Sequence, residues 1–352
     1  MSLGDPPPQT EEAAVLAAVR VGDEAAFTDL AERYRRQLQV HCYRMLGSFD
    51  DAEDLVQETF LRAWRGRHSF EGRSLFRTWL YRIATNACLN ALDRAPRRVL
   101  PPDVAPPVAA TVDASDARDE PPWRPELPWL QPYPDRLLEP AAPTDTAPDA
   151  VAIARETIEL AYLAALQHLP ARQRAILILR DVLGWSAKEV AALLELTVAA
   201  VNSAHQRARA RLRAQLPTGR DDWAAAGPRT DDERALLTAF MDAWERADVA
   251  ALTALLREDA RWAMPPTPLW FDGRAAIARV FELFPIGSRG AFRMAPTGAN
   301  RQPAAAAYLR PPGASAYRLV SLNVLRIERG QIAEVTTFAP TLCRAFGLPP
   351  TL

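Results

Sequence analysis

The sequence has few of the residues from which metal centres and disulfide frameworks are built. Its cysteines are Cys42, Cys88 and Cys343, which are odd in number, far apart and without a CxxC pair. This spacing supports neither a zinc ribbon nor a disulfide framework. We therefore expect reduced cysteines that serve packing, with no bound metal and no cofactor.

Long hydrophobic runs are also missing. Residues 1–12 are polar and contain proline, so they do not form the apolar core of a secretory signal. No uninterrupted apolar run approaches the roughly 20 residues that a membrane span needs. The formal net charge is −1, which excludes a uniformly basic nucleic-acid binder. We expect a cytoplasmic protein without membrane contact, whose contacts with DNA, if any, come from locally concentrated charge.

Proline divides the chain into segments. The 31 prolines are dense in residues 96–150 and absent from the helical pattern of residues 12–95. Residues 96–150 predict a linker, because proline prevents both regular helix and central strand. Helical periodicity returns in residues 151–216, whereas residues 231–352 combine helical and strand-like patterns. The chain of 352 residues is long enough for these as separate domains.

The first helical segment predicts an exposed acidic ridge. Asp23 can cap a helix that Gly47 ends, and further helices are expected from near Asp50 and from Ser74. On the helix that starts near Asp50, the residues opposite the apolar stripe are mostly acidic, with one leucine among them: Asp51, Asp54, Glu58 and Leu61. No catalytic cluster is visible in this segment.

Residues 171–213 have the pattern of a helix-turn-helix. Ser186 and Glu189 form a capping box for a short helix through Leu194, and Thr197 can cap a second helix to about Arg213. Small polar residues lie near the start of that helix and arginines near its end. Such an arrangement is typical of base contacts followed by phosphate contacts, although an ordinary helical hairpin with a basic face has the same spacing.

Three strings together resemble the extracytoplasmic-function (ECF) sigma factors of the sigma-70 family. DDAEDLVQETFLRAW (50–64) resembles the family's polymerase-docking helix, and FRTWLYRIATNACLNALDR (76–94) resembles its −10 helix. LPARQRAILILRDVLGWSAKEVAALLELTVAAVNSAHQRARARL (169–212) resembles its −35-reading domain. The resemblance implies a non-enzymatic transcription initiation factor whose partners are core RNA polymerase, through its β′ clamp and β flap, and promoter DNA.

The resemblance also implies residue roles. The polymerase-binding set would be Asp51, Asp54, Gln57, Glu58 and Leu61. The −10 set would be Phe70, Glu71, Arg73, Ser74, Arg82 and Asn86. The −35 set would be Thr197, Ala200, Asn202, Ser203, Gln206, Arg207, Arg209 and Arg211. The family usually has basic residues where Asn202 and Ala204 stand and a leucine at His205, so this chain's −35 readout differs from the family pattern.

The linker and the last segment suggest a fused regulatory domain. PWLQPYPDRLLE (128–139) resembles a string found in a subgroup with an additional C-terminal domain, and it predicts docking on the protein's own domains or on polymerase. WAMPPTPLWFDGRAAI (262–277) resembles SnoaL-like members of the NTF2 superfamily. We expect helices first and then a curved antiparallel sheet with a hairpin at Arg329-Gly330, which together form an α+β cone.

The resemblance to SnoaL-like proteins implies a pocket that could hold a small ligand. Its lining would be drawn from Trp262, Met264, Trp270, Phe271, Tyr308 and Tyr317. All four histidines lie before residue 231, which excludes a histidine-based acid/base site in this domain, and no catalytic residue is expected.

Two other hypotheses remain open from the sequence. One is a ligand-responsive helix-turn-helix regulator that works without core polymerase, which would not need the acidic ridge or the FRTWLYRIA helix. The other is an NTF2-like enzyme with a DNA-binding appendage, which would need a convergent acid/base pair. The preferred fold is multidomain: two all-α domains, the second with the helix-turn-helix, followed by the α+β cone.

Overall fold

The computed structural model describes residues 16–19, 21–70, 75–108, 124–138, 158–216, 230–283 and 286–352. The chain forms two compact units. The helical unit comprises Met1–Pro96 and Leu166–Gln215, and the sheet unit comprises Arg97–Ala165 and Leu216–Leu352. Among the described helices, none is long and apolar enough to cross a membrane.

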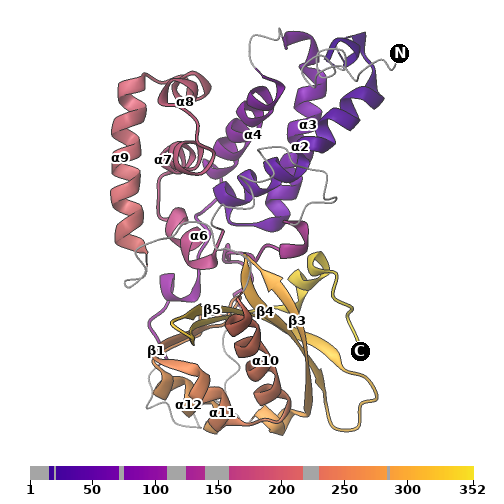
Figure 1. The fold of residues 1–352 in the computed structure, drawn as a ribbon, viewed down its shortest axis with the longest axis vertical. Coiled ribbons are helices and arrows are strands. Elements are labelled where there is room, and N and C mark those ends of the chain that lie inside the picture. Colours follow the sequence, from indigo (N-terminus) through magenta and orange to yellow (C-terminus); the bar gives the residue numbers. More distant parts are fainter. Residues whose placement is uncertain are drawn as a thin grey trace, which may run out of the picture. The chain divides into compact units, whose positions relative to one another are not determined.

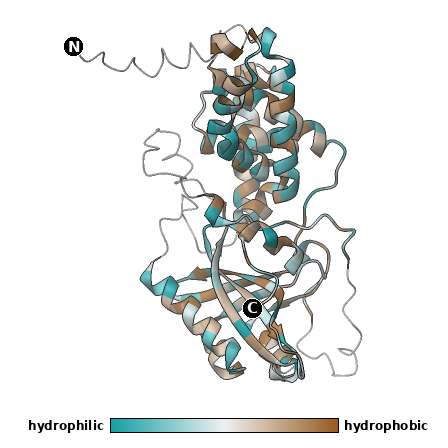
Figure 2. Ribbon diagram, turned by 90° about the vertical axis from the view of Figure 1, so that its right-hand side faces the viewer, coloured by the Kyte–Doolittle hydropathy of each residue, from teal (hydrophilic) through white to brown (hydrophobic). Residues whose placement is uncertain are grey.

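The first part of the helical unit contains α2 (Glu24–Leu46), α3 (Phe49–Arg65) and α4 (Phe76–Leu92), which pack on one another (Figure 1). The expected helix ends are confirmed: Asp23 accepts a hydrogen bond from Ala26 N, and Gly47 has a left-handed φ of 68°. Ser48 caps α3 by accepting from Asp51 N. In Figure 2, hydrophobic and hydrophilic residues alternate along the helices of this unit, as expected of amphipathic helices around a core.

His41 lies at the centre of this core. Its Nε2 is 2.9 Å from Thr85 Oγ1 on α4, and its ring centroid is 5.1 Å from that of Tyr81. Burial, reinforced by the positive charge of Arg44, lowers the pKa of His41 to about 3. The imidazole is therefore neutral at physiological pH.

The second part of the helical unit contains α7 (Ala171–Leu177), continued by a π-helical turn, Ile178–Val182, then α8 (Ala187–Leu194) and α9 (Val198–Gln215). A buried guanidinium on α7 joins the two parts. Arg174 donates to Met45 O at the end of α2, to Gln167 Oε1 at 2.7 Å and to Leu169 O at 3.1 Å. Because a buried charge needs such partners, this contact fixes where α7 lies against α2.

The sheet unit begins with the helices α10 (Asp231–Glu245) and α11 (Val249–Leu255) and later contains α12 (Arg274–Leu283). Its strands are β1 (Leu256–Ala263), β2 (Trp270–Asp272), β3 (Ala291–Ala299), β4 (Gln302–Arg310), β5 (Arg318–Glu328) and β6 (Gln331–Phe338). They form one sheet in the order β2-β1-β6-β5-β4-β3, and α10 contacts β3 and β4.

The α+β cone is confirmed, with two differences in its sheet. The sheet expected to be antiparallel is mixed, because four strand pairs are antiparallel but β1 pairs with β6 in parallel. The sequence pattern also did not predict β3, which contains Pro296 and Gly298 and lies at the sheet edge, where proline is tolerated. The hairpin at Arg329-Gly330 is confirmed, since both residues have positive φ between β5 and β6.

Strand β4 is buried on both faces. Ala304 to Ala307 are each at most 3% exposed, and Ala305 and Ala307 belong to the core under the helices. On the other face, Tyr308 donates to Pro349 O at 3.0 Å. Small side chains thus let the sheet be covered closely on both sides.

The aromatic-proline segment expected to dock does so on the β3–β4 turn. Asn300, in the left-handed region at φ 56°, accepts from Tyr133 N at 2.8 Å through Oδ1 and donates to Ile158 O at 2.6 Å through Nδ2. Its own N–H donates to Tyr133 O at 2.8 Å. One side chain therefore ties the linker at Tyr133 and the following segment at Ile158 to the sheet.

We predict that Asn300→Ala destabilises the sheet unit by about 2–4 kcal/mol, because it leaves buried Tyr133 N–H and Ile158 carbonyl groups unpaired and places alanine at positive φ. Urea unfolding of the full chain measures the change. Gln331→Ala, at an exposed position of the β5–β6 hairpin, is the control. A shift no larger than that of the control would contradict this role for Asn300.

We also predict that the helical unit loses stability as pH falls from about 6.5 to about 3. In this window the unfolded chain protonates His41 near its ordinary pKa of about 6.5, whereas the folded chain does so only at about 3. The unfolded state then binds more protons, which gives up to about 1.4 kcal/mol per pH unit. Urea unfolding of His41→Gln at several pH values should lack this slope, and exposed His68→Gln should retain it.

Candidate nucleic-acid interface

Helix α3 presents the acidic ridge predicted from the sequence. Asp54, Gln57 and Leu61 are exposed, and Leu61 is 56% exposed, which is high for a large apolar side chain. Glu58 lies on the same helix but forms an ion pair of 2.6 Å with Arg62, and Asp51 is half-buried next to the Ser48 cap. The ridge thus offers the exposed carboxylate of Asp54 near the exposed Leu61, a combination suited to a basic partner with an apolar contact point.

The residues predicted for the −10 element divide between a core cluster and a helix face. Phe70 is 6% exposed and packs on Phe76 and Trp79, with ring centroids 5.8 and 5.1 Å away. Glu71, Arg73 and Ser74 lie outside the described residues. Asn86 is exposed on α4, as is Arg82, which forms a 3.0 Å ion pair with Glu195. An exposed pair of this kind contributes little stability, so it is readily exchanged for another partner.

Helices α8 and α9 form the predicted helix-turn-helix. Ser186 and Glu189 form the capping box, and Thr197 Oγ1 accepts from Ala200 N at 3.1 Å. Between the helices, Glu195 takes the left-handed conformation at φ 56° and ends α8. Val201, Ala204, Ala208 and Leu212 are the buried residues of α9, so the opposite face is open.

The open face of α9 contains two kinds of polar side chain. Asn202 and Gln206, one turn apart, are exposed. The neighbouring residues contact protein groups: Arg207 donates to Ser203 Oγ at 2.6 Å, and Arg211 donates to Gln173 Oε1 at 3.1 Å. Carboxamides can recognise an adenine edge with two hydrogen bonds, whereas arginines can also contact phosphates.

Two side-chain contacts of Asp181 link α9 to the π-helical turn after α7. Asp181 Oδ1 is 2.7 Å from His205 Nε2, and Asp181 Oδ2 is 3.4 Å from Arg209 Nε. The sequence predicted an inward His205, and its side chain is 14% exposed. Asp181 thus anchors the middle of α9 from outside the helix-turn-helix, a role that helical periodicity alone did not identify.

Val198 is a further open residue that the sequence analysis did not select. It is the first residue of α9 and is 43% exposed, unusual for a valine at a helix start. An apolar side chain at the beginning of such a helix can contact a thymine methyl group. Its position directly after the Thr197 cap could have indicated that it lies at the exposed start of the helix.

Of the six residues expected to line a ligand pocket, Trp262, Phe271 and Met264 belong to or pack on one hydrophobic core. Trp262 packs in the aromatic core against Phe240 and Phe281, and its Nε1 donates to Thr337 Oγ1 at 2.8 Å. Tyr308 is fully buried and donates to Pro349 O. Trp270 donates to Ala105 O, and Tyr317 contacts Arg293 and Arg310.

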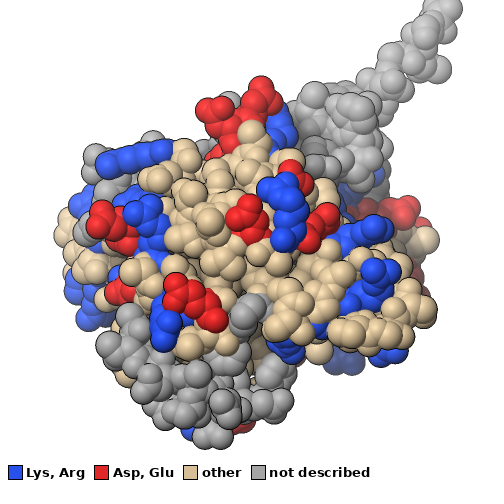
Figure 3. Space-filling model, turned by 90° about the horizontal axis from the view of Figure 1, so that it is seen from below, with Lys and Arg blue, Asp and Glu red and all other residues tan. Residues whose placement is uncertain are grey.

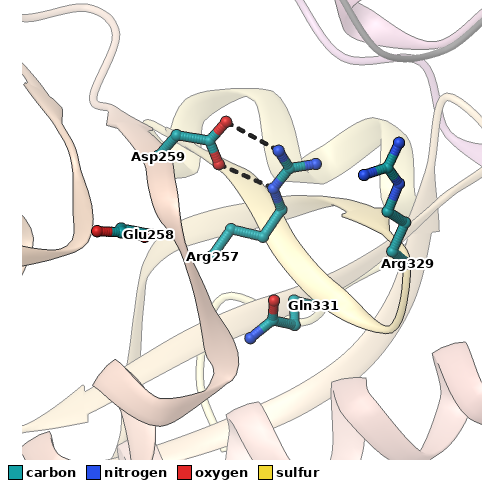
Figure 4. Close-up of a pocket in the computed structure, with 5 residues that line it drawn as sticks. All are labelled: Arg257, Glu258, Asp259, Arg329 and Gln331. Atoms are coloured by element: carbon teal, nitrogen blue, oxygen red, sulfur yellow. Dashed lines mark hydrogen bonds and ion pairs between the residues drawn. The ribbon is translucent and has the colours of Figure 1, made fainter.

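A polar hollow of about 470 Å³ lies instead at the start of β1 and the β5–β6 hairpin (Figure 4). Arg257 donates to both carboxylate oxygens of Asp259 at 2.8 Å and to Glu328 at 2.6 Å. The Arg257 guanidinium lowers the pKa of Asp259, chiefly through these hydrogen bonds. Since the charges neutralise each other and the hollow is open, it offers no proton-transfer pair. Within the described residues, no group of three or more metal-ligating side chains is arranged around a metal position.

Comparison with protein families agrees with this division of the chain. Residues 30–98 match the sigma-70 region 2 family, residues 159–212 match sigma-70 region 4, and residues 237–335 match the SnoaL-like domain. The first two matches include α3, α4 and the helix-turn-helix, and the third includes the sheet.

Individual relatives extend the comparison over the whole chain. The ECF RNA polymerase sigma factor SigG of Mycobacterium tuberculosis is 42% identical over 335 residues, which are 95% of this chain and 86% of the relative. The ECF RNA polymerase sigma factor SigW of Bacillus subtilis is 30% identical over 198 residues, which are 56% of this chain and 92% of the relative.

Among solved structures, the extracytoplasmic function sigma factor SigJ of Mycobacterium tuberculosis has a similar fold. The TM-score is 0.57 at 19% identity, and the match covers 92% of this chain and 100% of that one. Two sigma regions in the expected order, a SnoaL-like domain after them and a full-length relative lead to one assignment. The chain belongs to the ECF RNA polymerase sigma factors of the sigma-70 family, with a C-terminal SnoaL-like domain.

Proposed function

We propose that this transcription initiation factor binds core RNA polymerase through α3, contacts promoter DNA through α4 and α9, and is regulated by its sheet unit. The observation that supports this most directly is the open face of α9, where Asn202 and Gln206 are exposed beside arginines. Family membership supplies the process, and the geometry of the exposed faces supports the residue assignments.

Polymerase binding is assigned to the ridge Asp51, Asp54, Gln57, Glu58 and Leu61. Its carboxylates suit a basic surface on the β′ clamp, where complementary charge steers the encounter and fixes the register. The exposed Leu61 would supply the apolar contact at the centre of the interface. The second helical part, with α9, is the region expected at the β flap.

Promoter contacts are assigned to two elements. At the −10 element, Arg82 and Asn86 on α4 would lie along the DNA strand, with the loop from Phe70 to Ser74 holding an unstacked base. At the −35 element, Thr197, Ala200, Asn202, Ser203 and Gln206 would lie in the major groove. Phosphate contacts would come from Arg207, Arg209 and Arg211, whose hydrogen bonds to protein groups are surface contacts that phosphates can replace.

Regulation is assigned to the docked linker. Asn300 holds Tyr133 and Ile158, and Gln302 Oε1 accepts from Leu160 N at 3.0 Å, at the start of α6 (Leu160–Gln167). The segment that connects the two sigma regions is therefore held by the SnoaL-like domain at residues 133, 158 and 160. We infer that this docking restrains the two regions and that its release increases transcription.

We predict that the double variant Asp54→Arg/Leu61→Asp binds core polymerase at least about 10-fold more weakly and loses run-off transcription, since it reverses charge and buries a carboxylate at the contact. Competition against labelled parent chain measures the affinity. Asp232→Arg, an exposed position on α10, is the matched control. Parent-like core binding by the double variant would exclude the ridge as the docking surface.

We predict that undocking the linker raises run-off transcription by at least about fivefold, the lower end of typical allosteric couplings. Asn300→Ala and a chain ending at Pro217 should both show the increase, because both remove the side-chain hydrogen bonds of residue 300 to Tyr133 N and Ile158 O. Gln331→Ala should transcribe like the parent. Equal transcription by all four proteins at matched concentration would rule out regulation through docking.

A further inference from the structure

One corner of the sheet unit carries a tyrosine ring contacted by two arginines. The guanidinium carbon of Arg293 on β3 lies 5.1 Å from the ring centroid of Tyr317, and that of Arg310 at the end of β4 lies 4.7 Å from it. Both arginines are exposed and Tyr317 is half-buried. We call these three residues the arginine–tyrosine patch.

Rigid backbone positions the patch. Arg293 pairs with Tyr308 and Arg310 with Ala291 in the β3–β4 ladder, so both arginines are placed by strand register. Gly290, at φ 130°, allows the backbone before β3 to approach the end of β4 closely. A Cβ at this position would collide with the Arg310 carbonyl oxygen. Tyr317 exchanges two backbone hydrogen bonds with Leu352, of 3.2 and 2.9 Å. The patch is therefore preorganised rather than carried on a loose loop.

Neither arginine of the patch forms an ion pair with the described residues. The exposed arginines Arg318 and Arg329 form none either, whereas others of this unit do: Arg234 pairs with Asp231, and Arg279 pairs with Glu282 at 2.9 Å. What distinguishes Arg293 and Arg310 is that two unpaired guanidinium groups contact one ring. On the face seen in Figure 3, acidic and basic side chains are interspersed.

The surrounding sequence is rich in arginine and poor in acidic residues. Residues 286–352 contain eight arginines and two glutamates, in a chain whose net charge is −1. Both glutamates are already bound: Glu328 pairs with Arg257 and Arg326, and Glu334 pairs with Arg326 at 3.1 Å. An anionic ligand from outside the chain would therefore remove the repulsion between the two guanidinium groups.

We propose that the arginine–tyrosine patch binds the phosphate backbone of duplex DNA, as a second DNA-contacting surface separate from the helix-turn-helix. Arginine forks match phosphate oxygens with two hydrogen bonds, and two arginines a strand apart can contact neighbouring phosphates. The Tyr317 ring holds both guanidinium groups on the surface without adding an acceptor charge. The contact has no sequence preference, because backbone contacts position a protein without reading bases.

The test is the affinity of the full chain for a promoter-free DNA duplex, measured by fluorescence anisotropy from 50 to 300 mM salt. For Arg293→Ala/Arg310→Ala, we expect at least about fivefold weaker binding at 100 mM salt. The slope of log affinity against log salt should fall by about 0.9 for each phosphate that the variant no longer neutralises. Arg293→Lys/Arg310→Lys should keep the parent slope, because it keeps both charges.

The matched control is Arg234→Ala/Arg279→Ala, which removes two paired arginines of the same unit and should bind like the parent. Urea unfolding verifies that each variant is folded. Parent-like affinity and slope for Arg293→Ala/Arg310→Ala would overturn the proposal. So would weaker binding of polyglutamate with unchanged DNA binding, which would show an acidic polypeptide as the ligand. Since the duplex lacks a promoter and no polymerase is present, the result does not depend on the proposed polymerase contacts or base contacts, and the α9 arginines contribute equally to the parent and to every variant.

Discussion

One buried carboxamide anchors the linker on the sheet. Asn300 occupies a left-handed turn position and uses both ends of its side chain for backbone groups of Tyr133 and Ile158. A polar side chain with no exposed surface must satisfy its hydrogen bonds inside the protein, and here Tyr133 of the linker and Ile158 beyond it supply two of the partners. A segment rich in proline, which cannot fold by itself, is thereby given a fixed place on a sheet.

Local signals predicted much of the helical unit. Helix caps contact backbone groups only a few residues away, so their positions in the sequence are sufficient to predict where the helices begin and end. This holds for Asp23, Gly47, Ser186 and Glu189. The acidic ridge on α3 follows from helical spacing in the same way. Long-range partners were not predictable: Arg174 reaches Met45 O, and Asp181 reaches His205, from other helices.

The sheet unit was predicted less well, for two physical reasons. Strand β3 contains proline and glycine, which its edge position tolerates, and its pairing with β4 is a long-range contact that local propensity does not reveal. All but one of the expected pocket residues are aromatic, and aromatic residues fill cores as readily as they line cavities. Trp262 and Phe281 pack 5.3 Å apart between ring centroids, so the interior that the resemblance suggested for a ligand is occupied there by side chains.

The alanine run of β4 has a consequence for self-association. Its inner face is covered by the helical core, and at the end of the strand Tyr308 on the other face donates to Pro349 O. A second copy that bound at Tyr308 would first have to displace the segment around Pro349. That segment therefore acts as an intramolecular competitor there, at far higher effective concentration than any free partner.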